Sequence, residues 1–109
     1  MTKKAIRAAY RKWRKENNNA KPNRAVVHMK WEDGDNTDKG WQQDTVALDA
    51  FWNRTREVLF PSDDCEILYY CDGLEGLCDL AHPGNGSEFV VINVVDFYKH
   101  VEPKASKAA

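Results

Sequence analysis

The apolar residues between positions 45 and 60 constrain the fold of this chain more than any other pattern in it. They recur at i, i+3, i+4, i+7, i+10 and i+11, which is one face of an α-helix, and they are Leu48, Phe51, Trp52, Thr55, Val58 and Leu59. Asp44 or Thr45 can cap the start of this helix, and Pro61 requires it to end near Phe60. We therefore predict an amphipathic helix over residues 45–60 that buries this face against the rest of the domain.

Residues 3–16 are predicted to form a second helix, because their apolar and basic residues separate at helical spacing. One stripe is apolar and consists of Ile6, Ala9, Tyr10 and Trp13. The opposite side is basic and consists of Lys4, Arg7, Arg11, Lys12, Arg14 and Lys15. Three asparagines at 17–19 compete for backbone hydrogen bonds, and Pro22 cannot continue a helix, so a linker follows.

Three segments have the composition of strands. Residues 25–31 alternate, with Val27, Met29 and Trp31 on one face, and residues 65–71 and 88–95 are rich in β-branched and aromatic residues. Between the last two segments, four residues have the spacing of a single helical turn: Leu74, Leu77, Cys78 and Ala81.

The order helix, strand, helix, strand, strand predicts an α+β fold in which two helices pack on a small three-stranded mixed sheet. The first two strands flank a helix and are therefore expected to be parallel, while the last returns antiparallel. We expect Leu48, Phe51, Trp52, Val58 and Leu59 to pack on Val27, Met29, Ile67, Val91 and Val95 of the sheet. Residues 1–102 form a single domain, which includes the basic N-terminal helix and linker over 1–24; residues 103–109 form a disordered tail.

Composition favours a soluble, cytoplasmic chain. The 109 residues fit one domain, and 42% of them are apolar and 30% charged. No apolar run approaches the roughly 18 residues that a membrane span needs, and the N-terminus lacks the apolar region of a secretory signal. Three cysteines without a secretory signal are expected to stay reduced.

The charge of the chain is strongly asymmetric, although its net charge is only −1. Residues 1–30 hold ten basic residues and one acidic residue, a net charge of +9, whereas the other 79 residues hold six basic and sixteen acidic residues, a net charge of −10. Such asymmetry indicates either a charged partner or a basic helix that docks on the acidic surface of its own domain.

Two arrangements have the residue types of metal sites but depart from their spacing. The short Cys-x2-4-Cys element of zinc sites is missing from the set Cys65, Cys71, Cys78 and His82. The glycine and the final glutamate of a calcium loop are missing from the set Asp33, Asp35, Thr37 and Asp44. We therefore expect no metal and no cofactor.

No spacing indicates a catalytic site either, so we expect no enzymatic activity. A small enzyme would need Cys71 or Cys78 to meet His82 in space, which makes catalysis the weakest of three alternatives.

Recognition of a protein partner is the leading functional hypothesis. Trp41, at the exit of the acidic loop 32–40, is the kind of large aromatic residue that anchors interfaces. The alternative is nucleic-acid binding, in which the six basic residues of the helix over 3–16 would contact phosphates. In size, charge asymmetry and lack of a catalytic motif, the chain resembles as a class the small accessory or inhibitor proteins of bacteria, phages and mobile elements. The partner and the oligomeric state do not follow from the sequence.

Overall fold

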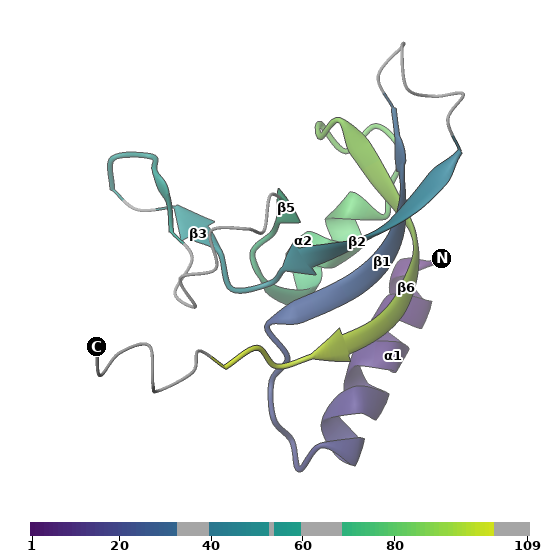
Figure 1. Ribbon diagram of the computed structural model, residues 1–109, viewed down its shortest axis with the longest axis vertical. Helices are drawn as coiled ribbons and strands as arrows, with labels where there is room; N and C mark the ends of the chain where they lie inside the picture. Colours follow the sequence, from purple (N-terminus) through teal and green to yellow (C-terminus); the bar gives the residue numbers. More distant parts are fainter. Residues whose placement is uncertain (33–39, 53, 60–68, 102–109) are drawn as a thin grey trace.

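In the computed structural model of the chain, residues 1–32, 40–52, 54–59 and 69–101 are described (Figure 1). Two helices lie on one face of a four-stranded sheet, and a two-stranded hairpin lies beyond the end of that sheet. The elements in chain order are α1 (Lys3–Glu16), β1 (Arg24–Trp31), β2 (Trp41–Ala47), β3 (Phe51–Trp52), β4 (Val58–Leu59), β5 (Tyr69–Tyr70), α2 (Gly73–Leu80) and β6 (Phe89–Tyr98). The α+β class and the mixed sheet are as predicted.

The sheet has the strand order β5-β2-β1-β6, so β1 lies in its interior. β1 pairs antiparallel with both β2 and β6, and only β5 is parallel to its neighbour β2. Ala25, Val27 and Met29 are fully buried and alternate with the less buried Val26 and His28. The predicted apolar face of this strand is confirmed.

The predicted number and pairing of strands were wrong in two respects. The sheet has four strands instead of three, because residues 41–47 return as β2 and form an antiparallel pair with β1. This pairing places β2 between β1 and β5, so the predicted parallel neighbours are separated and antiparallel. Of the predicted strand 65–71, only Tyr69–Tyr70 is strand, and residues 65–68 lie outside the described residues.

The predicted helix over 45–60 is absent, and its residues contribute to β2, β3 and β4 instead. Thr45 and Val46 are β-branched and lie opposite Val26 and Ala25 of β1. The strand pairing of β2 with β1 therefore outweighs the helical spacing of the apolar residues. Arg56 has a φ of +66°, which no right-handed helix contains. The second helix of the fold is α2, where the sequence indicated only a single turn.

The core prediction for this region was correct for part of its residues. Leu48, Val27, Met29 and Val91 are buried together. Phe51 is 45% exposed and Val95 is 48% exposed, so neither belongs to the core. Val95 is the extra residue of a register shift in β6, which explains why its side chain leaves the buried face. Ile67 and the tail 103–109 lie outside the described residues, as do the side chains of Trp52, Val58 and Leu59.

Helix α1 covers the sheet with the apolar stripe predicted from its sequence. Ile6 is fully buried, and the ring of Tyr10 meets that of Phe97 on β6 edge to face, with 5.6 Å between centroids. The hydroxyl of Thr2 accepts a hydrogen bond from the amide of Ala5 and so caps the helix. Helix α2 packs beside it, and at Gly76 an added Cβ would lie 3.0 Å from the Cβ of Cys71, so this close approach favours glycine.

Two adjacent residues at the start of β1, Asn23 and Arg24, form a polar anchor that connects three segments of the chain. The backbone amide of Asn23 donates a hydrogen bond to the carbonyl of Tyr98, and the carbonyl of Asn23 accepts one from the amide of Leu48. The side chain of Asn23 forms two more hydrogen bonds with the backbone of His100, one as donor and one as acceptor. Arg24 is fully buried, and its guanidinium lies 2.9 Å from the carboxylate of Asp49. A buried cation needs such a partner because removal from water is costly.

We predict that Asp49→Ala lowers the free energy of unfolding by about 3 kcal/mol or more, because it removes the carboxylate that faces the buried Arg24. The matched control is Asp79→Ala, which removes an exposed ion pair to Lys3 and should cost less than about 1 kcal/mol. Urea denaturation measures both. Equal losses in the two variants would contradict the importance of the buried pair.

Candidate binding site

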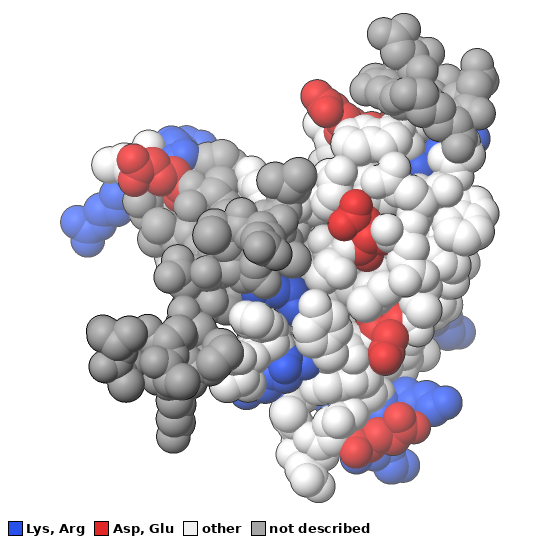
Figure 2. All heavy atoms as spheres, viewed as in Figure 1, with Lys and Arg blue, Asp and Glu red and all other residues white. Residues whose placement is uncertain are grey.

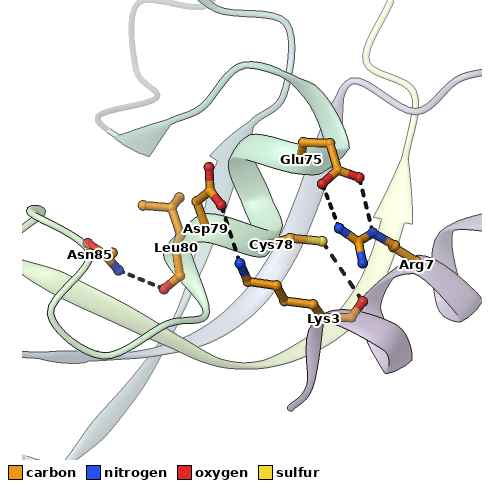
Figure 3. A network of polar contacts seen from close by, with 7 residues as sticks. All are labelled: Lys3, Arg7, Glu75, Cys78, Asp79, Leu80 and Asn85. Carbon is orange, nitrogen blue, oxygen red and sulfur yellow. Dashed lines mark hydrogen bonds and ion pairs between the residues drawn. The ribbon is translucent and has the colours of Figure 1, made fainter.

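The basic side of α1 is divided between internal contacts and solvent. Lys3 lies 3.6 Å from the carboxylate of Asp79, and Arg7 donates two hydrogen bonds of 3.1 and 2.7 Å to Glu75 on α2 (Figure 3). The hydrogen bond with Arg7 lowers the pKa of Glu75, and the same bond raises the pKa of Arg7. One part of the basic helix therefore docks on an acidic surface of its own domain.

Four of the six predicted contact residues keep their charges exposed. Arg7 is paired with Glu75, and Arg14 donates to the carbonyl of Asn19 just beyond the helix. The other four are Lys4, Arg11, Lys12 and Lys15, all exposed and none in an ion pair with another described residue. Basic side chains gather over α1 at the margin of the molecule in Figure 2.

Trp41 lies at the start of β2 and is 59% exposed. Its ring stacks on that of His28 with 4.2 Å between centroids and a 33° tilt, and it lies opposite Lys30 in the register. These residues alternate with the buried residues of β1, so they belong to the face of the sheet that carries no helix. Figure 2 views this side, whose described side chains are mostly uncharged, with a few acidic and basic ones among them.

The described thiols are poorly suited to catalysis. Cys71 is half-buried and Cys78 is buried, with their sulfurs 3.6 Å from the carbonyl of Gly73 and 3.9 Å from that of Lys3. Burial raises the pKa of Cys71 to about 12 and also raises that of Cys78, so both favour the neutral thiol, which is a weak nucleophile. His82 is exposed, and no described hydrogen bond joins it to either sulfur.

The metal sets considered from sequence gain no support from the part of the chain that is described. No group of three or more His, Cys, Asp or Glu side chains in that part could hold an ion. Cys65, Asp33, Asp35 and Thr37 lie outside the described residues. Asp44 accepts hydrogen bonds from Gln42 and from the amide of Thr45.

Sequence reasoning missed a cavity of about 290 Å³ at the end of the sheet where β1 finishes. Three aromatic residues from three strands meet there, namely Trp31, Tyr69 and Phe89. The cavity is also lined by Tyr70 and by residues 86–88. Each aromatic residue lies at or near the end of a strand predicted from the sequence. The three rings come into contact only through the observed strand order, which the sequence did not predict.

A second surface missed from sequence is a groove of about 240 Å³ between α1 and β6. Ala9, Lys12, Trp13 and Glu16 form its helical side, and residues 94–97 form the other. β6 is an edge strand, and two register shifts together with a bond from the Met1 amino group to the carbonyl of Ile92 interrupt it. Such interruptions are typical of edges that avoid unspecific pairing.

We predict that the stability of the protein falls as the pH rises from about 9 to about 12, because Cys71 keeps its proton longer when folded than when unfolded. The stabilisation is complete below the ordinary thiol pKa of 9.0 and disappears at the folded value of about 12, at up to about 1.4 kcal/mol per pH unit. Urea denaturation of the wild type and of Cys71→Ala at several pH values measures the difference. Parallel losses in the two proteins would contradict it.

Comparisons with models of known protein families, with curated proteins and with solved structures find no match for this chain. Neither described helix has the length and apolar character that crossing a bilayer requires. Any functional assignment therefore depends on the geometry of the surfaces described above.

Proposed function

We propose that this chain is a non-catalytic binding module that recognises a protein partner through the sheet face around Trp41. The observation that carries the proposal is the 59% exposure of Trp41, on a sheet face that neither helix covers. The stack on His28 restrains the indole before binding, so little side-chain entropy is lost when a partner covers it. Tryptophans of this kind are enriched among the residues that dominate interface energies.

The charge distribution favours a protein over a nucleic acid as the occupant of this face. Lys30 lies opposite Trp41, and the described side chains on this side of the molecule are mostly uncharged, with acidic and basic ones scattered among them (Figure 2). A phosphate backbone needs several cations along its path. The exposed cations of α1 belong to the opposite layer of the fold, so they do not supply them here.

Affinity purification of wild-type and variant chains from the native cell tests the proposal. We expect a defined protein to be recovered with the wild type and lost with Trp41→Ala, since truncation of an interface anchor typically costs 2 kcal/mol or more of binding, or roughly thirtyfold. Phe51→Ala is the matched control, because Phe51 is a comparably exposed aromatic residue on β3. Nucleic acid in the eluate, or equal recovery with Trp41→Ala, would contradict the proposal.

Nucleic-acid binding by α1 is the second candidate, supported by the four exposed basic residues that lack a described ion pair. Contact by Lys4, Arg11, Lys12 and Lys15 alone predicts a log–log salt dependence with a slope of about −4 on duplex DNA. Replacement of Lys4, Arg11 and Lys15 by Glu should abolish this binding, whereas Arg7→Gln should leave it unchanged, because Arg7 is committed to Glu75. A titration at several salt concentrations measures the slope, and a slope near zero would exclude this mode.

A further inference from the structure

Three aromatic rings in mutual edge-to-face contact line the open cavity at the end of the sheet. The ring centroids of Trp31 and Tyr69 lie 6.0 Å apart, those of Trp31 and Phe89 6.2 Å apart, and those of Tyr69 and Phe89 5.1 Å apart. The interplanar angles of 63°, 74° and 69° turn the three rings in different directions, and their contacts join them into one aromatic cluster at the cavity. We call this site, with its further lining residues Tyr70 and 86–88, the aromatic pocket.

Hydrogen bonds fix the walls of the aromatic pocket. The indole nitrogen of Trp31 donates to the side chain of Gln42 at 3.1 Å, and Gln42 in turn donates to Asp44 at 3.3 Å. The side chain of Asn85 donates to the carbonyl of Phe89 and accepts the amide of Ser87, which shapes the loop that forms the fourth wall. A site whose walls are already ordered loses little entropy when a ligand binds.

Carboxylates make the surroundings of the aromatic pocket negative. Glu88 lines the pocket, and its carbonyl accepts the amide of Glu32 at the end of β1. Tyr69 has a raised pKa because it is partly buried and because the charge of Asp44 acts on it. No lysine or arginine is among the described residues that line the cavity. Aromatic faces and carboxylates both attract cations.

We propose that the aromatic pocket binds an alkylated ammonium group. A volume of about 290 Å³ is at the lower limit for drug-sized ligands, so it suits a single small group better than a whole cofactor. The faces of Trp, Tyr and Phe attract a positive charge, and methyl groups on nitrogen make favourable apolar contacts with the same rings. An unmodified lysine ammonium is strongly hydrated and loses more on leaving water.

Two sources supply this chemistry, namely a trimethylated lysine in a protein segment and choline. The lysine source rests on the proposed function, because it requires a protein partner, whereas choline binding does not. Trp31 and Trp41 lie at the same end of the sheet on opposite faces. One partner that reaches around this end can therefore contact Trp41 and place a cationic side chain in the pocket.

A titration of the full chain with choline tests the pocket directly, with the indole N–H resonance of Trp31 as the readout. We expect a saturable shift of this resonance in the millimolar range or below. The control ligand is dimethylbutanol, in which carbon replaces the nitrogen of choline, so shape is kept and charge is removed. It should bind at least about tenfold more weakly. Equal binding of the two compounds, or no shift of the Trp31 resonance, would overturn the proposal.

Matched substitutions separate the pocket from the rest of the surface. Trp31→Leu should weaken choline binding by about threefold to thirtyfold, the range for loss of one cation–π contact, while Trp41→Leu leaves it unchanged. Since Trp31 also contacts the core, Glu88→Gln provides an independent variant that keeps the fold, and Glu16→Gln on α1 is its control. Weakening by Glu88→Gln but not by Glu16→Gln supports the proposal, and equal effects would overturn it.

A peptide that contains trimethyllysine, compared with the same peptide containing lysine, distinguishes the sources. Preference for the methylated peptide with a shift at Trp31 assigns the site to a protein partner. Binding of choline without that preference assigns it to the small molecule. If neither binds while Trp41-dependent capture of a protein persists, the pocket proposal fails and the proposed function stands.

Discussion

The buried guanidinium of Arg24 is the constraint on which the path of the chain depends. A cation with no exposed surface requires a carboxylate and hydrogen-bond acceptors at fixed positions, and Asp49 and the carbonyl of Asn23 provide them at 2.9 and 2.7 Å. Asp49 lies just beyond the end of β2, so the contact fixes where that strand stops and the chain turns toward β3. Asn23 joins the end of β6 to the same place through Tyr98 and His100.

This constraint also explains which elements could be predicted from the sequence and which could not. Helix α1 and strand β1 have local patterns that agree with their tertiary environment, since their apolar faces are the faces that the core buries. The segment over 45–60 has a helical pattern, but seven residues of β2 pair with β1 and Asp49 contacts Arg24. Long-range pairing and a buried charge, neither visible in a local window, outweigh the periodicity.

The charge asymmetry of the sequence is resolved in part within the fold. Lys3 and Arg7 dock on Asp79 and Glu75 of α2, so two of the basic residues of α1 are paired with acidic residues of the same domain. Exposed pairs of this kind contribute little stability, but they orient α1 on the sheet. The aromatic pocket could not be predicted in the same way, because its rings come from β1, β5 and β6 and only the strand order brings them together.

The two ends of β1 thus have different chemistry. At its start, the polar groups of Asn23 and Arg24 are bonded to the end of β6 and to Asp49, so they are committed to contacts within the domain. At its other end, Trp31 contributes to the pocket on the helix side, while His28, on the opposite face of the strand, supports Trp41 on the open side. A recognition surface is best built where a rigid scaffold ends and presents side chains to solvent. The polar anchor at one end of β1 therefore favours the aromatic end as the place where we propose that a partner binds.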